Sequence, residues 1–138
     1  MLTDFFKYQA QTTPHPLAME ISHALGSYIY DTKGTKFLDF VAGVSANTLG
    51  HQNKRVNHAI KTQLDKYSHV MVYGEYAQSS AVELCKLLAE NLPYPLTKTY
   101  LVNSGTEAIE GALKLARRLT GRSQLISCHN AYHGNTMG

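Results

Sequence analysis

The sequence has few cysteines, little net charge and no long apolar run, and each shortage excludes a class of protein. Cys85 and Cys128 are its two cysteines, too few to hold a secreted fold together, which favours the reducing cytosol. Thirteen basic and ten acidic residues are scattered along the chain and leave a net charge of +3, so no basic surface for nucleic acid is expected. Nowhere do about eighteen apolar residues follow one another, and the first residues lack a basic stretch leading into an apolar core. We therefore expect a cytoplasmic protein that binds neither nucleic acid nor a membrane.

The most informative segment is 101–108, with the sequence LVNSGTEA. An apolar strand end turns through Ser104, Gly105 and Thr106 directly into a helix. Glycine lets the backbone approach a ligand closely, and the unpaired N–H groups of the new helix carry the positive end of its dipole. Such a helix start binds anions, phosphate among them. The same residues also form an ordinary N-cap, which needs no ligand, and the segment alone does not decide between the two interpretations.

The residues that follow predict a strand–helix–strand unit around this turn. We expect strands over 99–103 and 124–128 and a helix over 105–119. The crossover makes the two strands parallel, so that the loops after both strands lie at the same edge of the sheet, where α/β proteins bind ligands. The second loop, NAYHG at 130–134, then brings Tyr132 beside the helix start.

Two kinds of side chain in this loop have alternative interpretations. On periodicity alone, Tyr132 is equally well a half-buried loop tyrosine, but the neighbouring helix start favours stacking of its ring on a ligand. His129 and His133 have the spacing of a metal pair only on a helix, and Gly134 after a strand favours a loop. We therefore predict no metal site at these two histidines.

Four segments follow one another in the order and at the approximate spacing of one known family. They are GSYIYDTKGTKFLDF at 26–40, LGH at 49–51, NSGTEAIEGALKLARR at 103–118 and AYHG at 131–134. Together they resemble the class III pyridoxal-phosphate (PLP) aminotransferases, such as the acetylornithine, ornithine and 4-aminobutyrate aminotransferases. The resemblance implies the α/β architecture of the fold-type-I PLP-dependent transferases. It places an amino-terminal hairpin segment of the small domain over 1–45 and the start of the large PLP-binding domain, with its mainly parallel sheet, over 46–138.

The resemblance also implies roles for the residues around the turn. Ser104, Gly105 and Thr106 would bind the phosphate of pyridoxal 5'-phosphate through N–H and hydroxyl groups, and Tyr132 would stack on its pyridine ring. The family's catalytic lysine forms a Schiff base with the cofactor, and no lysine of residues 1–138 fits that role. Lys114 lies in the middle of the predicted helix, and Lys86 and Lys98 lie near the ends of predicted elements. No catalytic residue is therefore assigned within 1–138, and these residues alone are expected to be inactive.

Two positions are candidates for the substrate side. Tyr73 lies in an aromatic connector at 68–76, a region that helps to line the substrate entrance in the family. Asn135 stands where the named relatives commonly carry an arginine that grips a substrate carboxylate. Asparagine has neither the charge nor the bidentate fork of arginine. A donor held by that contact is therefore in doubt.

The resemblance implies a transaminase of amino acid metabolism. It would move an amino group from an amine or amino acid, of the acetylornithine, ornithine or ω-amino acid kind, to a 2-oxo acid, and it would work as a homodimer. The alternative is an inert fragment or split subunit that binds phosphate or a partner without catalysis. A nucleotide- or phosphosugar-binding module has less support, since the Gly-rich patterns of Rossmann and P-loop proteins are missing.

The remaining periodicity describes a scaffold. Apolar spacing predicts helices over 1–8, around 56–67 and over 75–91. The helix that begins after Gly105 carries apolar residues on more than one face, which predicts that it is buried on several sides. A parallel sheet needs cover on both faces and paired edges, so we expect further strands beyond Gly138.

Overall fold

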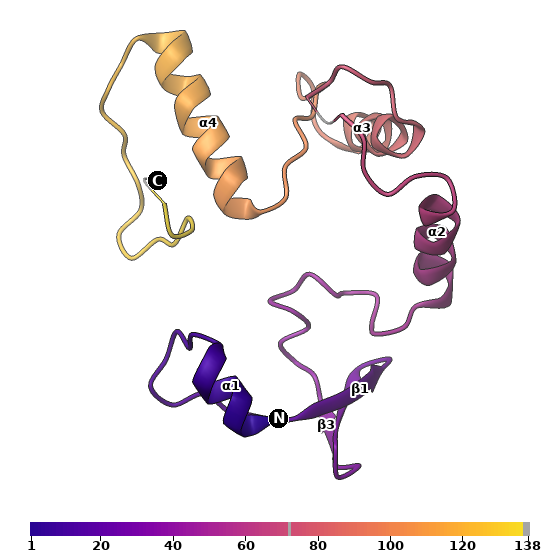
Figure 1. Cartoon of the computed structure of the whole chain (residues 1–138). Helices are drawn as coiled ribbons and strands as arrows, with labels where there is room; N and C mark the ends of the chain where they lie inside the picture. The colour runs from indigo at the N-terminus through magenta and orange to yellow at the C-terminus, as the bar shows by residue number, and fades with distance from the viewer. Residues whose placement is uncertain (72, 137–138) are drawn as a thin grey trace. The chain divides into compact units, whose positions relative to one another are not determined.

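The computed structural model describes residues 1–71 and 73–136 of the chain. In chain order (Figure 1), the elements are α1 (Leu2–Tyr8), β1 (Ile21–Leu25), β2 (Tyr28–Asp31), β3 (Lys36–Leu38), α2 (Lys54–Leu64), α3 (Ser79–Asn91) and α4 (Gly105–Thr120). The chain divides into two compact units, Met1–Val70 and Met71–Gly138. The domain limits expected from the sequence, 1–45 and 46–138, stay a prediction.

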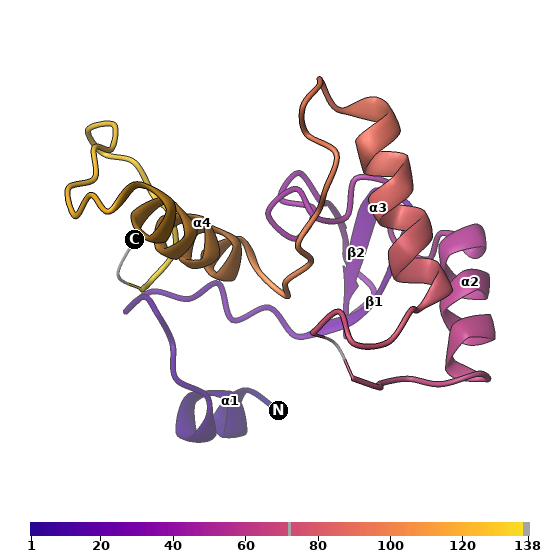
Figure 2. The same ribbon diagram turned by 90° about the horizontal axis from the view of Figure 1, so that it is seen from above.

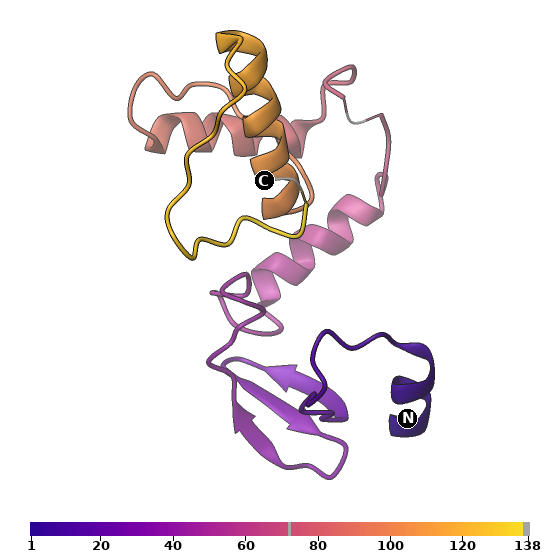
Figure 3. The same ribbon diagram turned by 90° about the vertical axis from the view of Figure 1, so that its left-hand side faces the viewer.

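The first unit contains a three-stranded antiparallel sheet of order β1-β2-β3 (Figures 2 and 3). β1 joins β2 through a tight turn at Gly26, whose φ of +57° lies in the region that glycine adopts easily. β2 and β3 form the hairpin that the family resemblance implies. In its turn, Asp31 Oδ1 accepts hydrogen bonds from the N–H groups of Lys33 (2.9 Å) and Thr35 (2.7 Å). The pairs β1–β2 and β2–β3 join strands that are neighbours in the sequence. The three strands of the described sheet therefore all come from residues 21–38.

Helices α2 and α3 begin in different ways. α2 begins at a side-chain cap, because Asn53 Oδ1 accepts hydrogen bonds from the first N–H groups of the helix at 3.1 and 3.2 Å. α3 begins at Ser79, later than the expected start at 75, and ends at Asn91 as predicted. The delay has a local cause: Gln78 is extended, with a φ of −110°, and its side-chain amide donates to the carbonyl oxygen of Met71 at 3.0 Å.

Helix α4 confirms the helix predicted over 105–119. Its end is set by Gly121, which adopts a left-handed φ of +68° and donates its N–H to the carbonyl oxygen of Arg117 at 2.9 Å. Glu107 lies in its first turn, and Arg117 and Arg118 lie in its last. These charges oppose the helix dipole at both ends and stabilise the helix.

The strands expected over 99–103 and 124–128 do not form among the described residues, where both segments lack regular secondary structure. A parallel strand is stable when neighbouring strands pair with it and helices cover its sheet. The described residues supply no such neighbours to these two segments. The chain after α4 instead runs back along the helix toward its first turn (Figures 1 and 2).

No residue of the described chain is buried. On α4, Leu115 is 56% and Leu119 is 75% exposed, so residues 1–71 and 73–136 do not bury this helix, and its burial on several sides stays a prediction. The periodicity lays out the apolar faces, but these residues provide no second layer to cover them. Among the described helices, none is both long and apolar enough to cross a bilayer.

Candidate functional site

The start of α4 forms a cradle, which consists of Ser104, Gly105 and Thr106. Ser104 is extended, and its Oγ accepts a hydrogen bond from the N–H of Glu107 at 3.2 Å, which makes it the N-cap. The N–H groups of Gly105 and Thr106 have no hydrogen-bond partner within residues 1–71 and 73–136. Because Ser104 Oγ acts as an acceptor toward the helix, its own O–H remains available to donate. The cradle is therefore a helix cap and still presents donors to an anion.

Glu107 modifies the charge at this helix start. Its Oε2 accepts a hydrogen bond from the N–H of Asn103 at 2.7 Å, so the carboxylate folds back over the first turn. With the Ser104 cap, this gives a reciprocal arrangement close to a capping box. The carboxylate is thus held on one backbone donor, and the N–H groups of Gly105 and Thr106 stay available.

The loop at 130–136 packs against the cradle. Gly134, with a φ of +109°, lies so close to Thr106 that an added Cβ would stand 2.7 Å from both Cβ and Cγ2 of Thr106 and nearer still to its Oγ1. Two residues later, Thr136 Oγ1 donates to Glu110 Oε1 at 2.6 Å. The two loops are therefore side by side, as the sequence led us to expect, although they meet by packing on α4 and without the sheet edge that we predicted.

Tyr132 and Asn135 belong to this loop and are both exposed. The Tyr132 side chain is 76% exposed, which leaves its ring free to cover a ligand. Asn135 stands between the two anchoring residues, Gly134 and Thr136. No hydrogen bond or ring contact of the described residues joins the loop to Tyr73, which is 78% exposed in the same unit. The structure thus brings the cradle and the Tyr132 loop together and does not bring Tyr73 to them.

These residues fit the phosphate of pyridoxal phosphate. A phosphate needs several N–H or O–H donors and a close approach to the backbone. Gly105 and Thr106 offer N–H groups, Ser104 offers a hydroxyl, and the dipole of α4 adds positive potential. Position 134 must be glycine for the loop to lie this close to Thr106, because a side chain there would collide with it.

A polar network in the first unit escaped the sequence reasoning, which treated His51 only as part of the LGH segment. His51 Nε2 lies 2.7 Å from Asp39 Oδ2, and His51 Nδ1 lies 2.8 Å from the side-chain nitrogen of Asn47. Asp39 Oδ1 accepts the N–H groups of Val41 (3.1 Å) and Ala42 (2.9 Å). The N–H of Ala42 and then the ring of His51 hold the pKa of the Asp39 carboxyl below its ordinary value. The sequence shows only that Asp39 and His51 are 12 positions apart, and this spacing does not predict a hydrogen bond between their side chains.

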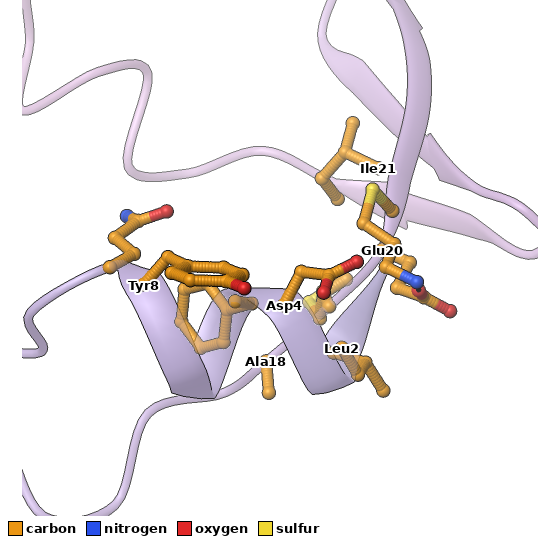
Figure 4. A pocket seen from close by; sticks show the side chains of 10 residues that line it. Leu2, Asp4, Tyr8, Ala18, Glu20 and Ile21 are labelled. Atoms are coloured by element: carbon orange, nitrogen blue, oxygen red, sulfur yellow. Dashed lines mark ion pairs between the residues drawn. The ribbon is translucent and has the colours of Figure 1, made fainter.

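The first unit also has an open hollow of about 440 Å³ between α1 and the segment that leads into β1 (Figure 4). Its labelled lining residues are Leu2, Asp4, Tyr8, Ala18, Glu20 and Ile21. The amino group of Met1 lies 3.8 Å from Glu20 Oε1 at this place. The hollow is mostly apolar and contains none of the predicted site residues.

Comparison with known proteins shows which family the chain resembles. The family model described as aminotransferase class-III matches residues 8–138. Acetylornithine aminotransferase of Methanopyrus kandleri is 39% identical over 113 residues, which cover 82% of this chain and 28% of that protein. The 5-aminovalerate aminotransferase of Pseudomonas aeruginosa is 39% identical over 129 residues, which cover 89% of this chain and 28% of that protein.

A solved structure is similar over nearly the whole chain. The adenosylmethionine-8-amino-7-oxononanoate aminotransferase of Methanocaldococcus jannaschii matches with a TM-score of 0.88 and 31% identity, covering 99% of this chain and 34% of that one. The chain therefore spans about a third or less of the length of these relatives. The likeness confirms the predicted fold class, the fold-type-I α/β architecture of PLP-dependent transferases. Since the matched residues include both the cradle and the Tyr132 loop, the chain belongs to the class-III aminotransferase family.

Proposed function

We propose that the protein is a PLP-dependent aminotransferase that moves an amino group from an amine or amino acid donor to a 2-oxo acid. The observation that carries this proposal is the packing of Gly134 on Thr106. This contact places the unpaired N–H groups of Gly105 and Thr106 beside the loop that carries Tyr132. A helix start alone would serve any anion, whereas a helix start beside an exposed aromatic ring suits a phosphate attached to a flat heterocycle. The relatives named as aminotransferases support the same activity.

In this proposal each residue of the site has a separate task. Gly105 and Thr106 donate their N–H groups to the cofactor phosphate, and Ser104 adds its O–H. Tyr132 covers one face of the pyridine ring and keeps water away from it. Bound there, pyridoxal phosphate would supply an electron-accepting ring that stabilises negative charge on the carbon beside the amine nitrogen.

The cradle also controls where negative charge lies. A free carboxylate beside a phosphate would repel it. The bond from the Asn103 N–H to Glu107 Oε2 fixes that carboxylate on a backbone donor outside the cradle, so the N–H groups of Gly105 and Thr106 stay available to the phosphate. The cradle residues therefore bind and orient the cofactor, and they exchange no proton with the substrate.

On the substrate side, we propose Tyr73 and Asn135 as contacts of the donor. An uncharged Asn135 would bind a donor without a guanidinium–carboxylate pair at that position. Replacement by arginine in the full chain then creates such a pair. We expect Asn135→Arg to lower KM for ω-amino acids that carry a free carboxylate and to leave KM for simple amines within about twofold. If the KM of Asn135→Arg equals that of the wild type for both donor classes, Asn135 does not contact the donor.

We also propose that the protein is a cytoplasmic homodimer, as the family resemblance implies. The test is the mass of the native assembly in solution. A mass of twice the chain supports the proposal, and a monomer at working concentration contradicts it.

The activity is tested in two steps on the full chain. First, pyridoxal phosphate is titrated and the visible absorption band is recorded, with pyridoxal and inorganic phosphate as separate comparisons. We expect tight binding of pyridoxal phosphate that inorganic phosphate weakens by competition, and weaker binding of pyridoxal. Equal affinity for unrelated anions would mean that the cradle is only a general anion site.

Second, amine donors and a 2-oxo acid are supplied and the new amino acid is measured. Transfer of the amino group establishes the activity. Binding of pyridoxal phosphate without any transfer would contradict the proposal and leave the alternative expected from the sequence, a chain that binds the cofactor phosphate without catalysis.

A further inference from the structure

Residues 42–45 form a left-handed turn in the first unit. Ala42, Gly43, Val44 and Ser45 have φ values of +47°, +60°, +55° and +66°. The N–H of Ser45 donates to the carbonyl oxygen of Val41 at 3.0 Å, which closes one turn of left-handed helix. In this conformation the Cβ of an L-residue crowds the following carbonyl oxygen, so consecutive left-handed residues other than glycine are rare. Three side chains therefore lie in a backbone conformation that their own chemistry disfavours.

Asp39, His51 and Asn47 hold both ends of this turn, and we call them the latch. At the first end, Asp39 Oδ1 accepts the N–H groups of Val41 and Ala42 at 3.1 and 2.9 Å. At the second end, the Asn47 side chain contacts His51 Nδ1 at 2.8 Å, and the Asn47 backbone N–H donates to the carbonyl oxygen of Ala42 at 2.9 Å. His51 joins the ends, because its Nε2 lies 2.7 Å from Asp39 Oδ2. An ionised Asp39 accepts a hydrogen bond from the Nε2–H group of His51, which leaves Nδ1 to accept a hydrogen bond from the Asn47 amide.

The latch is fixed to the sheet at the position of His51. The His51 N–H donates to the carbonyl oxygen of Gly26 at 2.8 Å, and the Gly26 N–H donates to the carbonyl oxygen of His51 at 3.0 Å. Gly50, with a φ of +82°, passes so near that an added Cβ would stand 3.1 Å from the Gly26 oxygen. The His51 and Asp39 side chains are 25% and 12% exposed, which makes them well shielded in a chain with no buried residue. The backbone of His51 is therefore fixed to the sheet, and its ring contacts the side chains at both ends of the turn.

We propose that the latch of Asp39, His51 and Asn47 keeps residues 42–45 in the left-handed turn, and that opening the latch releases the turn while the sheet stays formed. His51 acts as a positioning residue: it holds the carboxylate of Asp39, and that carboxylate holds the N–H groups of Val41 and Ala42. Without the ring, the carboxylate loses its fixed place and the turn returns to the conformations that L-residues prefer. The proposal goes beyond the aminotransferase function, because it concerns how the backbone of residues 42–45 is held.

Hydrogen exchange of single amides in the full chain tests this proposal. In His51→Ala, we expect the amides of Ser45 and Asn47 to exchange at least about tenfold faster than in the wild type, because their hydrogen bonds belong to the turn. The amides that pair β1 with β2 should exchange within about twofold of the wild type. The matched control is His58→Ala, which removes a histidine of α2 outside the latch and should change neither set. Unchanged exchange at Ser45 and Asn47 in His51→Ala would overturn the proposal.

A second substitution separates the latch from a general structural role of His51. Val44→Gly removes a Cβ that disfavours the left-handed conformation. Added to His51→Ala, it should bring the exchange of Ser45 and Asn47 back toward the wild-type rate. No recovery, or a loss of protection that spreads through β1 and β2, would show that His51 supports the sheet and not the turn. If His51→Ala does not yield folded protein, Asp39→Asn with and without Val44→Gly gives the same comparison, with the same outcomes for and against.

Discussion

The two units of this chain obtain their defined geometry in different ways. In Met1–Val70, three strands pair in one sheet, and the side chains of Asp39 and His51 bond across 12 positions of sequence. In Met71–Gly138, α3 and α4 begin and end at local signals, and the loop at 130–136 meets α4 through the close approach of Gly134 to Thr106. The first unit contains a network of three polar side chains, Asp39, Asn47 and His51. In the second unit the contact between loop and helix requires the absence of a side chain at Gly134, in addition to the hydrogen bond from Thr136 to Glu110.

The difference follows from the kinds of strand that each unit contains. Antiparallel hairpins pair neighbours in the sequence, so the first unit completes its sheet within a short segment. The expected strands 99–103 and 124–128 of the second unit are of the parallel kind, which requires several strands and covering helices. The second unit therefore keeps its two helices, α3 and α4, and its loops, but it forms no sheet among the described residues.

The largest effect is expected where the second unit depends on a missing side chain. Gly134→Ala adds a Cβ that collides with Thr106, so the loop must move away from the cradle. Overpacking costs about 1–3 kcal/mol, and we expect affinity for pyridoxal phosphate to fall by at least about tenfold. The measurement is titration of the visible absorption band of the full chain.

Gly111→Ala is the matched control for this substitution, because the nearest atom to its added Cβ is Tyr100 Cε1 at 3.9 Å. Gly111 lies on α4, the helix that carries Thr106. Gly111→Ala should leave the affinity for pyridoxal phosphate within about twofold of the wild type. A Gly134→Ala protein that binds the cofactor as tightly as the control would contradict the packing argument and, with it, the proposed joint site.

A smaller effect is expected from the ring of Tyr132. Aromatic contacts are worth about 0.5–1.5 kcal/mol beyond the area they bury, so Tyr132→Ala should weaken binding of pyridoxal phosphate by about three- to tenfold. Tyr132→Phe keeps the ring and should bind within about twofold of the wild type. If the two substitutions weaken binding equally, the hydroxyl group and not the ring is responsible, and the stacking role is wrong.

The smallest effect is expected in the first unit and depends on pH. A carboxyl group whose folded-state pKa is lowered, as that of Asp39 is, adds stability above its unfolded-state pKa and loses it as the pH falls through the folded-state value. His51 is the titratable partner that faces this carboxyl. We expect Asp39→Asn to lower Tm of the full chain at pH 7, and the difference from the wild type to close as the pH falls below about 4. A difference that stays constant from pH 7 to pH 3 would show that the charge of Asp39 does not matter.

Local signals made much of this protein predictable. Ser104 at the start of α4 and Gly121 after its end gave the helix its limits, because caps act within one turn. The hairpin of β2 and β3 was expected from the family resemblance of residues 26–40, and its turn is held by local hydrogen bonds to Asp31. The start of α3 was missed because Gln78 bonds its side chain to the Met71 carbonyl, a contact that no pattern of apolar residues reports. The roles of Tyr73 and Asn135 stay predictions, since nothing among the described contacts tests them.

By itself, the sequence determined the family, the approximate positions of the helices and the capped start of α4 at Ser104. These properties depend on residues within a few positions of one another, where propensity, capping and glycine conformation act. Only the tertiary structure decided that Gly134 meets Thr106, that His51 bonds to Asp39 and Asn47, and that residues 42–45 turn left-handed. The Gly134–Thr106 and His51–Asp39 contacts join residues far apart in the chain, and their distances follow from the path of the backbone between them, which no local pattern encodes. The turn at 42–45 is short in sequence, but the carboxylate of Asp39, which lies outside it, accepts the N–H groups at its first end.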